Sequence, residues 1–274
     1  MAIFNTVPPL VAGAGIKFDG ERISTAAAPR NLLDNSDFRN PVNQRGVKTV
    51  TASGYSIDRW AVDISASGAA NFEYNDVRLY APSGYASIYQ AIEKPELISG
   101  KAMTFAVANN SGNVYVLNFV GGTNTSMQKG HVSLIFFDKS LYIRVIESSN
   151  WEGFLWAALY EGEYTEETLP EYQPKGYGAE LAECQRYYTK GKVIFQRDPN
   201  IPTVLITNHE YPNVMRVTPA ISFGPPYSFT DGQKLNATLS NHFYNNASGL
   251  LSATISADPV VNTVIADFNA TADL

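Results

Sequence analysis

The chain has 274 residues, of which 45% are hydrophobic and only 17% are charged, and its net charge is −6. This composition is that of a folded protein with a sizeable core, and 16 tyrosines with so little charge favour β-structure over helical bundles. No cluster of lysine and arginine supplies the concentrated positive charge that nucleic acids or anionic membranes attract, so neither is an expected partner.

The first 20 residues have no basic stretch ahead of their apolar residues and are interrupted by Pro8 and Pro9, which argues against a signal peptide. No apolar run approaches the roughly 20 residues of a membrane span. We therefore expect synthesis in the cytoplasm without membrane insertion. The single cysteine, Cys184, excludes an internal disulfide and a thiolate zinc site.

Small residues, proline and glycine fill residues 1–30 without a sustained period. Such a segment cannot bury itself, so it is either disordered or laid against a partner. We assign it as an N-terminal attachment or oligomerisation arm.

Strand patterns follow from residue 31 to residue 175. Residues 103–108 and 113–120 are β-branched and aromatic with partial alternation, and residues 131–147 indicate a hairpin that turns near Asp138 and Lys139. In residues 153–162 we predict one shared face, made of Phe154, Trp156, Ala158 and Tyr160. Many short strands with polar turns predict a jelly-roll β-sandwich.

Residues 176–188 predict the one good helix, with Leu181, Cys184 and Tyr188 on one apolar stripe, so Cys184 is expected to be a buried small hydrophobe. Strand patterns resume in residues 189–274, and their clearest signal is the strict alternation of residues 264–274. One face of that strand collects Val264, Ala266, Phe268, Ala270, Ala272 and Leu274. The chain is thus predicted to be mostly β, with a connecting helix and a second, smaller antiparallel β-domain.

Catalytic patterns are missing, and the histidines His131, His209 and His242 stand apart from one another in the sequence. We predict neither an enzyme nor a cofactor. An acidic stretch could hold a structural calcium ion, although a solvated loop is the simpler interpretation. Its glutamates are Glu161, Glu163, Glu166, Glu167 and Glu171.

Aromatic side chains are the remaining chemical resource, because a flat ring can lie against the apolar face of a sugar while nearby amides and charges bind its hydroxyls. Residues 71–90 combine both kinds of side chain. The candidate carbohydrate-binding residues there are Tyr74, Asn75, Arg78, Tyr80 and Tyr85. The alternative is that these rings are ordinary strand residues that fill the sandwich.

Four motifs in order, NLLDNSDFRNPVNQRG (31–46), YSIDRW (55–60), YQAIEKPELISGKAMTFAVAN (89–109) and the aromatic-rich stretch that ends in CQRYY (184–188), resemble bacteriophage and prophage tail-fibre proteins. The resemblance covers roughly residues 31–274. It implies a lectin-like, non-catalytic jelly roll followed by a helix and a small terminal domain.

The resemblance also implies structural roles for the first two motifs. Side chains of Asn31, Asp34, Asn35 and Ser36 would brace the first turn by hydrogen bonds to the backbone, and Leu32, Leu33 and Phe38 would join the core. Asp58, Arg59 and Trp60 would form a buried anchor in which the Asp–Arg pair covers the indole.

The function that this resemblance implies is host attachment: a receptor-binding fibre of the virion tail, commonly a homotrimer, that binds a bacterial surface polysaccharide or other glycan without cutting it. Its further partners would be other phage tail proteins. Two alternatives remain: a virion spacer or collar that binds no glycan, and a capsule depolymerase or binding module of a polysaccharide-degrading system.

Overall fold

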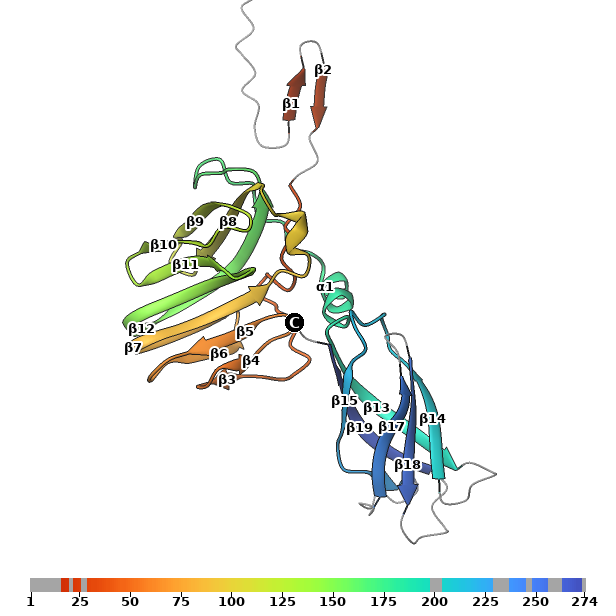
Figure 1. Cartoon of the computed structure of the whole chain (residues 1–274). Coiled ribbons are helices and arrows are strands. Elements are labelled where there is room, and N and C mark those ends of the chain that lie inside the picture. The colour runs from red at the N-terminus through yellow and green to blue at the C-terminus, as the bar shows by residue number, and fades with distance from the viewer. Residues whose placement is uncertain are drawn as a thin grey trace, which may run out of the picture.

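The computed structural model describes residues 16–19, 22–25, 29–197, 204–228, 237–244, 248–255 and 263–272. Within these ranges the chain forms three antiparallel sheets, one α-helix and one short 3-10 helix, η1 (Pro95–Leu97) (Figure 1). The prediction of a mostly β fold with a second, smaller sheet is confirmed.

The largest sheet has ten strands. They are β3 (Thr49–Val50), β4 (Gly54–Tyr55), β5 (Ala61–Ile64), β6 (Ala69–Tyr74), β7 (Asp76–Ala91), β8 (Ala102–Asn109), β9 (Val114–Val120), β10 (Thr125–Lys129), β11 (Val132–Phe137) and β12 (Ser140–Glu161).

Two long strands, β7 and β12, fold this sheet into a sandwich. The first half of β12 pairs with β11 and the second half of β7, whereas its second half pairs with β8 and the first half of β7. Register shifts near Ser148 in β12, opposite the Pro82–Ser83–Gly84 stretch of β7, mark the bend. The first layer consists of β4, β5, β10 and β11 with the second half of β7 and the first half of β12. The second layer consists of β3, β6, β8 and β9 with the first half of β7 and the second half of β12.

The core lies between these layers and draws on both. Phe119 of β9 stacks on Phe136 of β11 with ring centroids 4.5 Å apart, and both rings are almost fully buried. Leu33 and Phe38, from the segment before the first strand of the sandwich, are also buried in it, as expected. Leu32 is not: 44% of its surface is exposed, although its backbone N–H bonds to the Leu159 carbonyl.

The predicted hairpin is present, since β11 and β12 are joined by Asp138 and Lys139 alone. Both residues have positive φ, 43° and 65°, as the tight turns that suit strand twist require.

The predicted common face of residues 153–162 is wrong. Phe154 pairs with Asn109 but Trp156 pairs with Ala108, so Leu155 is an extra residue in the ladder. This bulge moves the following side chains to the opposite face. Phe154, Ala157 and Leu159 therefore face the core, and Trp156 lies outside it and stacks on Tyr172.

The helix α1 (Tyr177–Cys184) is shorter than the predicted segment 176–188. Tyr187 donates its N–H to the Cys184 carbonyl in a closing turn, and Tyr188 already begins a strand. Cys184 is fully buried, as its place on the apolar stripe indicates, and burial raises the pKa of its thiol far above the ordinary value.

The smaller sheet follows α1 and has the order β15-β19-β13-β14-β18-β17, with β16 also paired to β19. Its strands are β13 (Tyr188–Arg197), β14 (Val204–Glu210), β15 (Ala220–Phe223), β16 (Tyr227–Ser228), β17 (Ala237–Tyr244), β18 (Ser248–Ile255) and β19 (Thr263–Thr271). The predicted alternation is confirmed over residues 264–272: the five apolar residues of one face are buried in a second core. Leu274 lies outside the described residues.

Within the predicted arm, β1 (Ile16–Asp19) pairs with β2 (Arg22–Thr25) as a two-stranded hairpin. The rest of residues 1–28 lies outside the described ranges. Among the residues that the structure describes, no helix is long and apolar enough to cross a membrane.

Candidate functional site

A row of tyrosines lies on the outward side of the first layer. Ala61, Tyr89 and Tyr142 are cross-strand neighbours on β5, β7 and β12, and Asp63, Ser87 and Arg144 form the next row. Their strand neighbours face the core, so these side chains point outward. We name Tyr55, Tyr85, Tyr89, Tyr142 and Arg144 the tyrosine face.

The rings of this face are held in fixed positions. Tyr89 stacks on Tyr142 with centroids 4.8 Å apart and planes 23° apart. The Arg144 guanidinium lies 3.9 Å from the centroid of Tyr85. Arg144 is itself held, because its Nε donates to Ser87 Oγ at 2.8 Å and its Nη2 lies 3.4 Å from Asp63 Oδ2. These contacts hold Tyr85, Tyr89, Tyr142 and Arg144 in place before any ligand arrives.

The hydroxyl groups of the face are neutral donors and acceptors. Burial raises the pKa of Tyr85, Tyr89 and Tyr142, and the Asp63 carboxylate adds to the rise for all three. These phenols therefore stay protonated across the whole physiological pH range.

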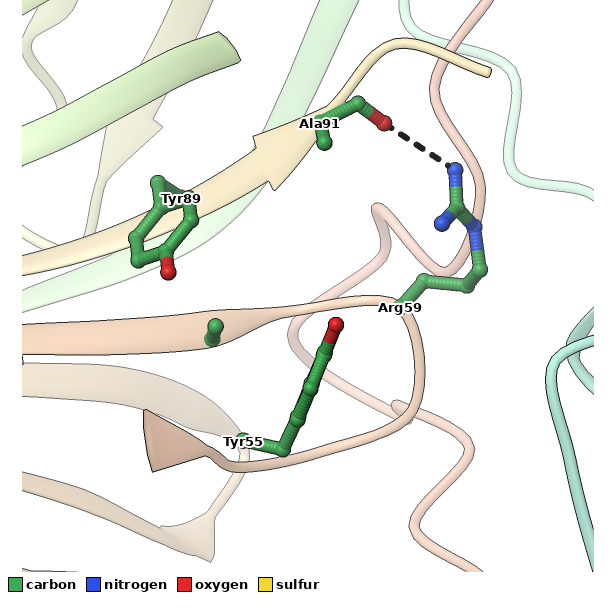
Figure 2. A pocket seen from close by; sticks show the side chains of 5 residues that line it. Tyr55, Arg59, Tyr89 and Ala91 are labelled. Carbon is green, nitrogen blue, oxygen red and sulfur yellow. Dashed lines mark hydrogen bonds between the residues drawn. The ribbon is translucent and has the colours of Figure 1, made fainter. Parts of the chain in front are cut away.

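A small pocket lies at one end of the tyrosine face. Tyr55, Arg59, Ala61, Tyr89 and Ala91 line it, and the two phenol rings form its walls (Figure 2). Its volume of about 30 Å³ admits about two water-sized groups. It therefore fits one substituent of a ligand, such as a hydroxyl or hydroxymethyl group, and not a whole sugar ring.

The structure separates the residues predicted to bind carbohydrate. Tyr85 belongs to the tyrosine face, whereas Arg78 and Tyr80 lie before the bend of β7, in the second layer. Asn75 is exposed at the tip of the turn between β6 and β7, and the side chain of Tyr74 lies outside the described residues. The predicted set is therefore not one surface.

The list of candidate residues predicted from the sequence lacks Tyr55, Tyr89, Tyr142 and Arg144. A signal was present, because outward and inward residues alternate in SLYIRV (140–145) and in YASIYQ (85–90). The alternation does not reveal the strand register that places these two segments, more than 50 positions apart, side by side.

The first predicted anchor, Asn31, bridges the opening segment to β12. Its Oδ1 accepts hydrogen bonds from the N–H groups of Leu33 (3.1 Å) and Leu159 (2.9 Å), and its Nδ2 donates to the Ala157 carbonyl. An asparagine side chain thereby replaces part of a strand ladder where the chain itself is not a strand.

Asn35 is the second anchor and is 1% exposed. Its Nδ2 donates to the carbonyls of Val42 (2.9 Å) and Asp58 (2.7 Å), and its Oδ1 accepts from the Val42 N–H. Its φ of 50° is one that asparagine tolerates better than most residues. This amide joins three loop segments in the interior.

The third predicted group, Asp58–Arg59–Trp60, is buried, but its ion pair differs from the expected one. Arg59 pairs with Asp34, with Nε 2.9 Å from Oδ2, and not with Asp58. Asp58 instead accepts from the Gln44 N–H and lies opposite Arg45. Arg59 has a positive φ of 70°. Trp60 donates its Nε1–H to the Asn35 carbonyl and packs edge-on to Phe38.

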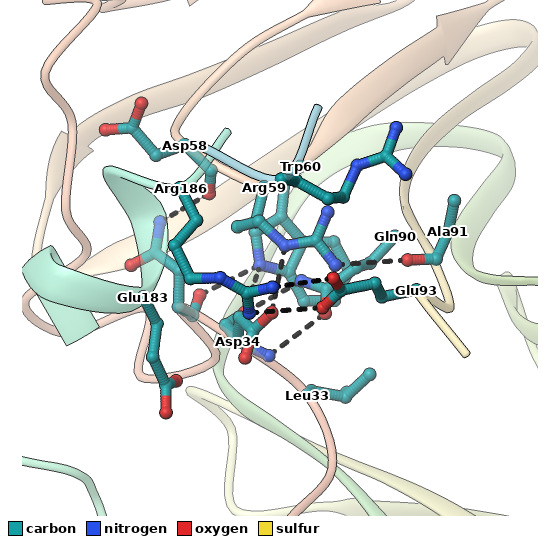
Figure 3. A network of polar contacts seen from close by, with 12 residues as sticks. Leu33, Asp34, Asp58, Arg59, Trp60, Gln90, Ala91, Glu93, Glu183 and Arg186 are labelled. Carbon is teal, nitrogen blue, oxygen red and sulfur yellow. Dashed lines mark hydrogen bonds and ion pairs between the residues drawn. The ribbon is translucent and has the colours of Figure 1, made fainter. Parts of the chain in front are cut away.

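Arg59 also belongs to a polar network that joins the sandwich to the C-terminal part of the chain (Figure 3). Its guanidinium lies 3.7 Å from the ring centroid of Tyr187, directly before β13. Beside it, Arg186 donates to Glu93 at 2.8 Å, and Lys175 contacts Glu183 on α1. We call these residues, with Asp34, the junction network.

Two carboxyl groups of the junction network, Asp34 and Glu93, have lowered pKa values. Burial alone would raise the pKa of Asp34, but the Arg59 and Lys175 cations outweigh it and hold that pKa below the ordinary value. Glu93 behaves in the same way, since the nearby Tyr187 phenol and the Arg186 guanidinium, which donates to it, together outweigh its burial. Burial wins at Glu180, whose pKa is raised although it accepts the Asn35 N–H.

The acidic stretch has partners of its own. Glu161 pairs with Lys101 at 2.8 Å and Glu166 with Lys129 at 3.1 Å, both at the surface. Among the residues that the structure describes, no group of three or more histidine, cysteine or carboxylate side chains is placed to hold a metal ion. His131 contacts the Ile146 carbonyl, and the side chains of His209 and His242 are outside the described set.

Comparison with known proteins adds little. No protein-family model matches the chain, and no curated protein does. Among solved structures the chain is similar to recombinant discoidin II of Dictyostelium discoideum, at 12% identity over 72% of this chain and 77% of that one, with a TM-score of 0.26. A likeness this weak carries no argument about function, so the site has to be interpreted from its own geometry.

Proposed function

We propose that this chain is a non-catalytic adhesion protein that binds a glycan through the tyrosine face. The observation that carries the proposal is the arrangement of the four rings: Tyr55, Tyr85, Tyr89 and Tyr142 are partly exposed on β4, β7 and β12 of the first layer, beside Arg144. Tyrosine suits such a surface, because its ring packs on apolar C–H groups while its hydroxyl bonds to polar ones.

The pocket sets how a sugar would lie there. With room for only one substituent, it orients a pyranose whose ring rests on the stacked Tyr89 and Tyr142. Arg144 and the phenol hydroxyls then reach the ring hydroxyls. Because Tyr89, Tyr142 and Arg144 are already held in place, little of their side-chain entropy is lost on binding.

Binding without bond cleavage agrees with the reactive groups that the structure describes. The Cys184 thiol is buried and its pKa is raised, so it offers no thiolate. Asp63 next to the face is engaged by Arg144 and Ser53, which suits a carboxylate that positions other side chains.

The biological setting that we propose is the tail of a bacteriophage or phage-like particle, where the protein serves in host attachment. The support is the ordered set of sequence motifs that resemble tail-fibre proteins. A homotrimer would fit this role, since tethered copies of a weak site gain effective concentration without new contacts. Light scattering should then give about three times the chain mass of 30.0 kDa, and a monomer at micromolar concentration would contradict the trimer.

The binding proposal is tested with the double variant Tyr89→Ala/Tyr142→Ala. Wild-type protein should bind some members of a printed glycan array or of a panel of purified bacterial surface polysaccharides, and the double variant should bind the same glycans at least tenfold more weakly, a loss of about 1.4 kcal/mol. The matched control is Tyr177→Ala, a tyrosine that is 48% exposed on α1.

The other outcomes distinguish the alternative functions. Wild type that binds nothing on either panel favours a virion spacer, and new reducing ends in the incubated polysaccharide favour a depolymerase. If binding survives in the double variant, the tyrosine face is not the site.

A further inference from the structure

A second aromatic surface lies on the other side of the β7 bend from the tyrosine face. Trp151, at the bend of β12, is 45% exposed and stacks on Tyr80 of β7 with centroids 5.2 Å apart and planes 21° apart. The tyrosine ring supports one face of the indole and fixes its orientation. The sandwich thus presents a second flat aromatic platform.

Polar side chains beside this platform are held in place by a buried carboxylate, Asp76. Asp76 is 4% exposed, and both of its oxygens accept from Arg78 Nε, at 2.8 and 3.0 Å. Asn110, from the turn after β8, donates its Nδ2–H to Asp76 Oδ2 at 2.9 Å. Arg78 lies two positions before Tyr80 and so shares its face of the strand.

A glycine on the paired strand β12 leaves room for the side chains of Asp76 and Asn110. Gly153 of β12 pairs with Arg78, and a Cβ at Gly153 would collide with the side chains of Asp76 and Asn110. The glycine lets the carboxylate and the amide pack directly over backbone. The side chain of Arg78 remains 37% exposed beside the platform.

We infer that Trp151 and Tyr80, with Arg78 beside them, form a second binding site, for the apolar face of a neutral pyranose. A neutral sugar is indicated because Asp76 already balances the charge of Arg78. A single ring is indicated because the residues that flank Trp151 are polar: Ser149 and Asn150 are exposed, and Glu152 is partly exposed. One exposed indole in a polar frame matches one sugar ring, whereas a stable protein interface needs about 800 Å² on each partner.

This second site is independent of the tyrosine face. It uses different residues, in the second layer and at the bend, and shares no side chain with the pocket. Two sites on one module would let a chain hold two residues of a polysaccharide, or two strands of it, at once. Weak individual sites would then add up to useful attachment.

The test is ¹⁹F NMR of the full chain labelled with 5-fluorotryptophan. The other two tryptophans differ from Trp151, since Trp60 is fully buried and Trp156 is covered by Tyr172. The Trp151→Ala variant assigns the Trp151 resonance. The probes are the methyl glycosides of glucose, galactose and N-acetylglucosamine, with the open-chain polyol mannitol as the control.

We expect at least one glycoside to shift the Trp151 resonance saturably, with a Kd in the millimolar range, while the Trp60 resonance stays still. Tyr80→Ala should weaken that binding about fivefold, because the indole loses its support, and Tyr80→Phe should restore it. The shift should persist unchanged in Tyr89→Ala/Tyr142→Ala, so a failure of the tyrosine face leaves this result intact.

The inference would be overturned by a Trp151 resonance that no glycoside moves, by an equal shift with mannitol, or by the loss of the shift in the tyrosine-face variant. A shift that appears only on raising the protein concentration would assign the platform to contact between two copies of the chain, and would also overturn it.

Discussion

Asn35 shows how much of the fold can depend on one side chain. Its amide makes three buried hydrogen bonds to two loops, and its backbone N–H donates to Glu180 of α1. Its left-handed φ adds a conformational requirement. Hydrogen bonding and backbone geometry therefore both select asparagine at this position.

Replacing Asn35 separates these two contributions. Asn35→Ala should lower the free energy of unfolding by about 3 kcal/mol, because buried groups of Val42 and Asp58 lose their partners. Asn35→Gly accepts the positive φ and should recover about 1 kcal/mol of that loss. Urea unfolding at neutral pH measures both, with the exposed Asn75→Ala as the control. Equal stability of the alanine variant and the wild type would show that water replaces the amide.

At the scale of the element, turns and bulges decide which way side chains face. The Asp138–Lys139 turn fixes the β11–β12 register, and its first strand pair, Phe137 and Ser140, starts an unbroken ladder. The bulge at Leu155 interrupts the β8–β12 ladder and moves Trp156 out of the core. The turn thus depends on two residues, Asp138 and Lys139, and the bulge on one, Leu155.

The turn makes a prediction about Lys139. Its φ of 65° is unfavourable for a lysine and favourable for a glycine. Lys139→Gly should therefore raise the free energy of unfolding by about 1 kcal/mol. Lys139→Ala, which removes the same side chain but keeps the strain, should give no gain. Thermal unfolding of the three proteins compares them, and a glycine variant that melts below the alanine variant would contradict the turn assignment.

For the whole molecule, the junction network determines how the two large sheets are joined. Besides Arg59 and Tyr187, Gln44 donates to the Tyr188 carbonyl, and Arg45 lies 3.9 Å from the Tyr188 ring centroid. Ala272, at the end of β19, donates back to the Tyr187 carbonyl. The segment after α1 is thus held by contacts on both sides.

This network predicts acid sensitivity. The folded pKa values of Asp34 and Glu93 lie below their ordinary values of 3.8 and 4.5, so the stabilisation that these carboxylates give is complete above those values and is lost as pH falls through the lowered ones. Glu180, with a raised pKa, opposes this trend, because its buried charge is destabilising until it is protonated. We expect stability to fall below about pH 4.

The variant Asp34→Asn tests the assignment. At neutral pH it should be less stable by about 3 kcal/mol, since Arg59 loses its buried partner. Below about pH 4 its stability should change less with pH than that of the wild type. Urea unfolding between neutral pH and pH 3 supplies both curves, with Glu167→Gln, an exposed carboxylate, as the control. If the stability of the variant and of the wild type changes with pH in parallel, Asp34 is not a cause of the acid sensitivity.

Much of the fold follows from local pattern. The alternation of residues 264–272 predicts a half-buried strand, and the polar pair at residues 138–139 predicts a turn between two apolar runs. Both predictions succeed because side-chain direction is a property of the backbone within a few residues. The same reasoning fails at residues 153–162, where one bulged residue reverses the pattern without any mark in the composition.

The sequence by itself therefore determined a mostly β chain, a buried Cys184 and the inward faces of its regular strands. Only the tertiary structure decided that Tyr89 stacks on Tyr142, that Trp151 rests on Tyr80 and that Arg59 pairs with Asp34. Each of these pairs joins residues 25 or more positions apart, and its register is set by packing of the whole sandwich. Local preferences extend over a few residues, whereas the surfaces proposed to bind sugars are assembled from strands that only the complete core brings together.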